Sequence, residues 1–182
     1  MLRKFAVLNL LALAVISFRA QAQFMGVEAG VRQQSATAEA VGVSTNTEMA
    51  FQFGLIGAFP LQDKFLFRSG FLYTQRPITV KGTPDQKYSL NYFDIPLTFL
   101  WKFNDHGGVY GGFNLALVAS ADCSACGNTS VDKKSQMPLV IGGTFKFAPD
   151  FGIDVYYEMM NKVNDDFKEA RAVGANLLIT FD

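Results

Sequence analysis

The sequence is poor in the residue types that most enzyme sites use. Of its 182 residues, two are cysteine, one is histidine and one is tryptophan. A structural zinc site needs four ligands, and a catalytic nucleophile needs a base beside it. The sequence shows no nucleophile motif, no phosphate-binding loop and no metal-ligand cluster. We therefore expect no cofactor, no metal and no catalytic site.

The sequence also lacks a long apolar run beyond its first residues. Residues 3–22 combine basic residues, an apolar stretch and an Ala-Gln-Ala cleavage motif, which is typical of a secretory signal. The stretch is shorter than the ~20 residues that a membrane-spanning helix needs. We predict a signal peptide over residues 1–22 and one mature domain over residues 23–182. The mild overall hydropathy excludes a helical membrane protein.

Neither sign of charge is in excess. The full sequence holds 16 basic and 16 acidic residues. Removal of residues 1–22 leaves 13 basic against 16 acidic residues, a formal charge of −3. This balance gives no reason to expect a nucleic acid as partner.

What the sequence does have is a period of two. In eight successive stretches the odd-numbered residues are apolar, small or uncharged polar, and nearly all the charge falls on even numbers. Successive side chains of a β-strand point to opposite faces, whereas a surface helix spaces its apolar residues by three and four. The pattern predicts strands at residues 24–34, 46–59, 64–76, 88–103, 108–120, 136–147, 151–160 and 170–181.

The predicted connections alternate between short and long. Residues 60–63, 104–107 and 148–150 are turns rich in Pro, Asp, Asn and Gly. Longer loops are expected at residues 35–45, 77–87, 121–135 and 161–169. This asymmetry is typical of outer-membrane barrels, which have short periplasmic turns and longer extracellular loops. The sequence thus predicts an all-β fold, an eight-stranded antiparallel up-and-down transmembrane β-barrel with both termini in the periplasm.

Alternation alone does not say which face is outside, because a soluble barrel such as a lipocalin would bury the apolar face. Three observations favour lipid outside. The apolar face has too many large rings for the interior of an eight-stranded barrel, and the even-numbered face carries charges of both signs at mid-strand. Aromatic residues also gather beside the short turns, where they would form a girdle at the membrane interface. The predicted girdle is Phe59, Phe65, Trp101, Phe103, Phe147, Phe151 and Phe181.

The even-numbered face is predicted to fill the lumen with a polar network. Five acidic residues match five basic ones, as a self-neutralising interior requires, because a buried charge without a partner costs several kcal/mol. A solvated polar face is the alternative. The predicted charged members are Glu28, Glu48, Asp94, Asp154 and Glu158 with Arg32, Arg68, Arg76, Lys102 and Lys146, and Gln52, Tyr110, Asn114 and Asn176 join them. Pro96 and Pro138 share this face, and each should mark a bulge or a strand end unless the phase is misassigned.

Three segments carry a resemblance to a known family. They are Tyr92–Leu97 with the letters YFDIPL, Tyr110–Phe113 with YGGF, and the closing segment Gly174 to Phe181. The chain resembles the small outer-membrane β-barrel proteins typified by OmpA and OmpX, and especially PorT-like β-barrel domains. The resemblance implies insertion in the lipid of a Gram-negative outer membrane, and we expect the barrel to be a monomer. The resemblance also implies that the closing segment is read by the barrel-assembly machinery, although Asp182 displaces the usual aromatic last residue.

Cys123 and Cys126 lie in the third long loop with the spacing of a redox motif. Because a secreted chain meets oxidising conditions, we expect a disulfide between them; a redox pair and a metal site are the alternatives. His106 lies in a short turn, at the opposite end from the outer rim. Asp154 and Glu158 share a face but stand ~13 Å apart along a strand, which is too far for a cooperating pair.

The leading functional hypothesis is a non-catalytic envelope component with a closed lumen that acts through its extracellular loops. A narrow pore for small solutes, a lipid-active outer-membrane enzyme and a soluble ligand-carrying barrel are the alternatives. The composition of the loops names no ligand and no protein partner.

Overall fold

The computed structural model describes residues 24–38, 44–82, 85–124, 134–164 and 167–181. The predicted signal peptide at residues 1–22 lies outside these residues. Among the residues described, no helix has the length and apolar character needed to cross a membrane.

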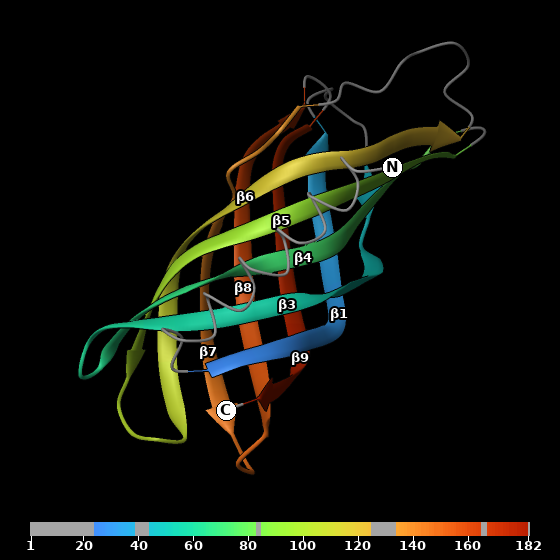
Figure 1. Ribbon diagram of the computed structural model, residues 1–182. Coiled ribbons are helices and arrows are strands. Elements are labelled where there is room, and N and C mark those ends of the chain that lie inside the picture. Colours follow the sequence, from blue (N-terminus) through green and yellow to red (C-terminus); the bar gives the residue numbers. More distant parts are fainter. Residues whose placement is uncertain (1–23, 39–43, 83–84, 125–133, 165–166, 182) are drawn as a thin grey trace, which may run out of the picture.

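The chain forms one closed antiparallel barrel, which confirms the predicted fold class. Figure 1 shows β3 to β6 crossing in front of β1 and β7 to β9. Each long strand pairs with its neighbours in the chain, β1 pairs with β9, and the β4–β5 pairing completes the ring. The strands are β1 (Phe24–Ala38), β2 (Thr45–Asn46), β3 (Glu48–Gln62), β4 (Phe65–Val80), β5 (Gln86–Lys102), β6 (Gly107–Ser124), β7 (Leu139–Lys146), β8 (Phe151–Asn164) and β9 (Phe167–Phe181). The two-residue β2 lies beside β4, so eight strands make the wall.

The barrel has two different ends. At one end lie the short turns and, side by side, the start of β1 and the end of β9, where Met25 faces Phe181. We call this the short-turn end, and the opposite end the long-loop end. At the long-loop end several strands run further than the sequence predicted: β4 continues to Val80, β6 to Ser124 and β8 to Asn164, whereas β7 begins only at Leu139 instead of residue 136. The prediction was wrong for the longer strands because polar residues extend a strand wherever a neighbouring strand supplies backbone partners.

Burial follows the predicted period of two. Along β5, Tyr92, Asp94 and Leu100 are buried, whereas Phe93 and Phe99 are exposed. Phe167 breaks the phase, because it has an odd number and is only 1% exposed. The pairing of β8 with β9 shifts register between Asn161 and Asn164. The pairing of β1 with β9 also shifts register, between Thr37 and Ala38, and Ala38 is paired with Phe167. Such irregularities turn the side chains beyond them to the other face of the sheet.

The two prolines of the inward face behave differently. Pro138 precedes the first residue of β7, as expected of a strand end, and its carbonyl accepts the Asn114 N–H at 2.9 Å. Pro96 lies inside β5. The described β4–β5 pairing is interrupted between Asp94 and Thr98, and the register is the same on both sides of the interruption. Because proline has no N–H to donate, the ladder has a gap. The expected bulge or strand end at Pro96 was therefore wrong.

Candidate functional site: the closed lumen

The interior of the barrel is built in three layers. The layer near the short-turn end is apolar, and so is the layer near the long-loop end; charged side chains fill the space between them. The first layer contains Phe24, Ile56, Ala58, Leu66, Leu100, Tyr110, Val140, Tyr156 and Leu178. The third contains Ile78, Leu90, Tyr92, Ala116, Met160, Phe167 and Ala170. The polar layer is thus enclosed between two apolar layers.

One half of the polar layer is a balanced group of two arginines and two carboxylates. Arg76 donates to both oxygens of Asp94, at 2.9 and 2.7 Å, and to Glu158 at 3.2 Å. Arg32 donates to Glu158 at 2.6 Å. The Arg76 guanidinium also lies 4.7 Å from the centre of the Tyr92 ring, in cation–π contact. These bonds join β1, β4, β5 and β8 across the lumen.

The other half has one arginine for two carboxylates. Arg68 donates to Glu28 at 2.6 Å and to Asp154 at 3.1 Å. The Tyr110 hydroxyl donates to the same Asp154 oxygen at 2.7 Å. Glu28 also accepts hydrogen bonds from the amides of Gln52 and Asn176. This half joins β1, β3, β4, β6, β8 and β9.

Seven of the ten predicted charged residues meet in these two groups, and three do not. Glu48 is the first residue of β3, Lys102 the last of β5 and Lys146 the last of β7. All three are partly exposed, and within the described residues none of them forms an ion pair with the network. Their inclusion was wrong, because long side chains at strand ends reach solvent from the inward face. The predicted balance of five against five becomes four carboxylates against three guanidiniums.

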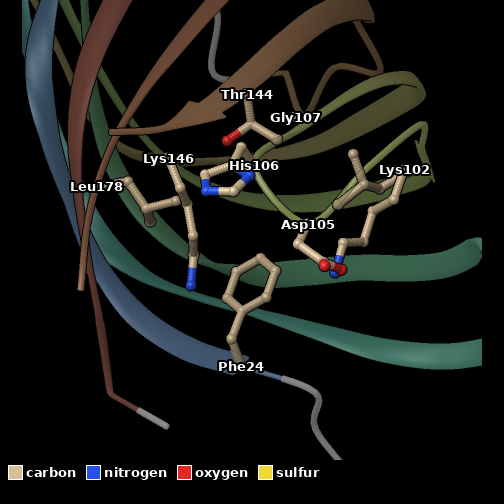
Figure 2. Close-up of a pocket in the computed structure, with 9 residues that line it drawn as sticks. Phe24, Lys102, Asp105, His106, Gly107, Thr144, Lys146 and Leu178 are labelled. Atoms are coloured by element: carbon tan, nitrogen blue, oxygen red, sulfur yellow. The ribbon is translucent and has the colours of Figure 1, made fainter. Parts of the chain in front are cut away.

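Lys102 and Lys146 instead line a cavity at the short-turn mouth. Its volume is about 200 Å³, and His106, Asp105 and Thr144 also border it. Figure 2 shows these side chains around the mouth, with Phe24 and Leu178 beside them. The Lys146 ammonium donates to the Pro149 carbonyl at 3.2 Å and lies 5.3 Å from the Phe24 ring.

Aromatic rings cover the outside of the barrel at the short-turn end. Phe65 stacks on Trp101 at 6.5 Å, and Phe147 stacks on Phe151 at the same distance. Phe103, Phe147 and Phe181 are also exposed, whereas Phe59 is half-buried. A second aromatic set stands on β3 to β5, between the two ends. Its cross-strand pairs are Phe53 with Tyr73, Phe71 with Phe93, and Phe67 with Phe99.

The residues considered for catalysis or metal binding either lie apart from one another or are already bound to other groups. His106 is exposed in its turn, and its backbone N–H donates to Asn104 Oδ1 at 2.9 Å. Asp154 and Glu158 are bound by different arginines. Over the described residues, no group of three or more His, Cys, Asp or Glu could hold a metal ion. Cys123 is disulfide-bonded at the end of β6; its predicted partner, Cys126, lies outside the described residues.

Sequence reasoning left several lumen residues out. Gln34 accepts a hydrogen bond from Arg32 at 3.1 Å, and Thr74 donates one to Gln52 at 3.4 Å; Tyr156 and Phe167 were left out as well. The Tyr156 hydroxyl donates to Gln52 Oε1 at 2.9 Å and links the first apolar layer to the polar layer. Its even number in a predicted strand was a signal that could have found it. Phe167 packs edge-on against Tyr88 at 5.4 Å between ring centres and fills the third layer. Its odd number and its place in a predicted loop gave no signal.

Comparisons with known proteins agree with this architecture. A family model described as the outer membrane protein beta-barrel domain matches residues 19–159. Among solved structures, the attachment invasion locus protein Ail of Yersinia pestis shares 17% identity, with a TM-score of 0.56, over 87% of this chain and 99% of that one. The outer membrane protein OprG of Pseudomonas aeruginosa shares 14% identity, with a TM-score of 0.50, over 88% and 95% of the two chains. Neisserial surface protein A shares 16% identity, with a TM-score of 0.50, over 86% and 97%. No curated protein matches the chain.

Proposed function

Because the chain belongs to the outer membrane protein beta-barrel domain family, we propose that it is a non-catalytic envelope component with a closed lumen. It stands in the outer membrane of a Gram-negative bacterium and acts through the surface at its long-loop end. The observation that carries this proposal is the three-layered interior. The likeness to PorT-like domains within this family rests on the sequence motifs around Asp94 and Tyr110.

The outer face supports insertion in lipid. Phe51, Phe53 and Leu55 are each more than half exposed, and similar residues continue around the wall. A soluble monomer rarely shows an apolar patch of this extent, whereas a transmembrane barrel requires one. The aromatic girdle at the short-turn end favours a membrane interface there, and short turns are typical of the periplasmic end of such barrels.

The interior favours a closed barrel over a narrow pore. Eight strands enclose a space that side chains just fill, and here Arg32, Arg76, Ile78 and Leu100 are fully buried within it. A conducting path would have to cross two apolar layers and break the ion pairs between them.

The long-loop end supports a role at the cell surface. Along the wall the outward-facing side chains are apolar, but at the long-loop end they are polar. Examples are Gln33 and Ser35 on β1 and Glu169 and Arg171 on β9. Glu169 and Arg171 form an exposed ion pair at 3.2 Å. The strands therefore continue beyond the apolar band and hold a polar surface in water.

Catalysis on lipid is the less favoured alternative. His106 lies at the short-turn end, away from the outer rim, and the buried carboxylates are bound to arginine. Hydrolysis or acyl transfer by the purified barrel on lipid A would contradict the proposal.

Two further expectations concern assembly. The segment Gly174 to Phe181 forms most of β9 and pairs with both β1 and β8. We propose that the barrel-assembly machinery recognises this segment and that the inserted barrel is monomeric.

The closed lumen is tested by conductance in planar lipid bilayers. The full chain is refolded into vesicles, and insertion is verified by heat-modifiable migration on a gel and by fractionation with outer membranes from cells. We expect insertion without steady current. Stable current steps that change in Arg76→Met would show a pore through the network and overturn the proposal, and a soluble periplasmic monomer would overturn it as well.

A further inference from the structure

The buried charges of the lumen leave a local negative excess. The group of Arg32 and Arg76 is balanced by its two carboxylates. The group of Arg68 is not, because Glu28 and Asp154 share this one guanidinium. All seven charged side chains are at most 6% exposed. A buried charge without a counter-charge is strongly unfavourable, so the Arg68 group needs one more positive charge.

Three oxygen atoms beside this group have no hydrogen-bond partner among the described residues. They are Thr144 Oγ1, Asp154 Oδ1 and Asn176 Oδ1, and each atom is buried. Thr144 lies directly opposite Asp154 in the β7–β8 pairing, and Asp154 lies directly opposite Asn176 in the β8–β9 pairing. Side chains opposite each other on one face start about 4.5–5.5 Å apart at Cβ. The three oxygen-bearing side chains thus form one row on the inner wall.

The other polar atoms of Asp154 and Asn176 already form hydrogen bonds, so their unpaired oxygens remain available as ligands. Asp154 Oδ2 accepts from Arg68 and Tyr110, so Oδ1 is the carboxylate oxygen that remains. Asn176 uses its amide nitrogen on Glu28, which leaves its Oδ1. A carboxylate oxygen and an amide oxygen only accept hydrogen bonds. Asp154 Oδ1 and Asn176 Oδ1 are acceptors on neighbouring strands, and Asn176 Oδ1 lies toward Gly30 of β1. Together with the negative excess, they call for a positive group near them.

We propose that a small monovalent cation of the alkali-metal type binds between Thr144, Asp154 and Asn176. Hard cations take carboxylate, carbonyl and hydroxyl oxygens as ligands. One unit of charge neutralises the Arg68 group. A calcium site would need six to eight oxygen ligands, usually with several carboxylates, and this row offers a single carboxylate.

The basic groups nearby do not supply this charge. Lys146 lies two residues beyond Thr144 on the same face of β7, but its ammonium is bound to the Pro149 carbonyl at the mouth. Lys102 borders the cavity from β5. Thr144 lines the same cavity, as Figure 2 shows, whereas Asp154 and Asn176 lie deeper and are buried.

The test measures the heat-unfolding midpoint of the full barrel in sodium chloride and in choline chloride at equal ionic strength. A cation that binds only the folded state raises the midpoint in a saturable way. We expect sodium to raise it and choline, which is too large, not to do so. Thr144→Val should shift the half-maximal effect to a several-fold higher sodium concentration, and Asp154→Asn should abolish the effect. Glu169→Gln, in the exposed pair with Arg171, should respond like the wild type.

Equal midpoints in the two salts at every concentration would overturn the cation site. A sodium effect of wild-type size in Thr144→Val would also overturn it, even if Asp154→Asn fails to fold. Stabilisation by acid in choline chloride, without any effect of sodium, would mean that a proton balances the charge and would equally reject the proposal. None of these results depends on whether the lumen conducts.

Discussion

Arg76 on β4 holds Asp94 on β5 through two parallel hydrogen bonds, from Nη1 to Oδ1 at 2.9 Å and from Nη2 to Oδ2 at 2.7 Å. Both side chains are fully buried. A fork of this kind fixes the orientation of both groups, which a single contact would not. Because Arg76 also donates to Glu158, it connects opposite walls of the barrel.

Replacement of Arg76 by methionine should destabilise the barrel by about 3–5 kcal/mol, because Asp94 would lose its buried counter-charge and Glu158 would keep only Arg32. Urea unfolding in lipid vesicles measures this free energy. Arg171→Met is the matched control: Arg171 is 62% exposed in its pair with Glu169, and such a surface pair contributes at most about 1 kcal/mol. Equal losses in the two variants would contradict the structural role of the network.

Phe167 should be needed for the apolar layer at the long-loop end. We expect Phe167→Ala to cost about 3–5 kcal/mol, as for a large buried side chain that leaves a cavity. Phe51→Ala, at an exposed position of the outer wall, is the control and should cost less. The midpoints of heat-modifiable gel migration rank the two variants, and a larger loss in Phe51→Ala would argue against an inward Phe167.

The depth of the outer face in lipid can be tested with two leucines of β3. Leu55 lies along the wall and Leu61 beside a short turn, and both are more than half exposed. Leu55→Arg should destabilise the barrel by about 2–4 kcal/mol, and Leu61→Arg by about 0–1 kcal/mol, because the cost of a lipid-facing charge falls from the midplane to the interface. Urea unfolding in vesicles gives both values. The reverse order would place the apolar band elsewhere.

Two glycines of β3 should differ in their tolerance of a methyl group. A Cβ at Gly54 would lie 2.7 Å from the Leu72 Cα of the neighbouring strand, whereas a Cβ at Gly57 would meet the Phe59 ring at 3.6 Å. Backbone cannot move aside as a side chain can, so Gly54→Ala should cost about 1–3 kcal/mol. Gly57→Ala should be close to neutral. Equal unfolding midpoints for the two variants would show that β3 and β4 are less closely packed than described.

The eight long strands and the face of most of their side chains, though not of Phe167, could be predicted because they follow from a period of two. Phe93 and Asp94, for example, are adjacent in sequence and lie on opposite faces of the wall. The same rule placed Lys102 and Lys146 inward. It could not say that they stand at the mouth, since parity carries no information about depth.

The partners within the network could not be predicted from the sequence. Glu158 on β8 meets Arg32, 126 residues away, and Arg76, 82 residues away, across the lumen. These contacts depend on the stagger of strands around the ring, which the alternation does not fix. Phe167 shows the same limit, because the register shift that turns it inward lies in a polar segment without any apolar pattern.

The central prediction is that the odd-numbered side chains face lipid while the even-numbered side chains fill a closed lumen. Trp101 tests it directly, because it is the only tryptophan of the sequence and stands on the lipid-facing side in the girdle, 46% exposed. The measurement is quenching of its fluorescence in vesicles by phospholipids brominated at different depths along the acyl chains. We expect strong quenching by the shallow bromines and little by aqueous iodide. Quenching by iodide alone, with none from any brominated lipid, would contradict the account.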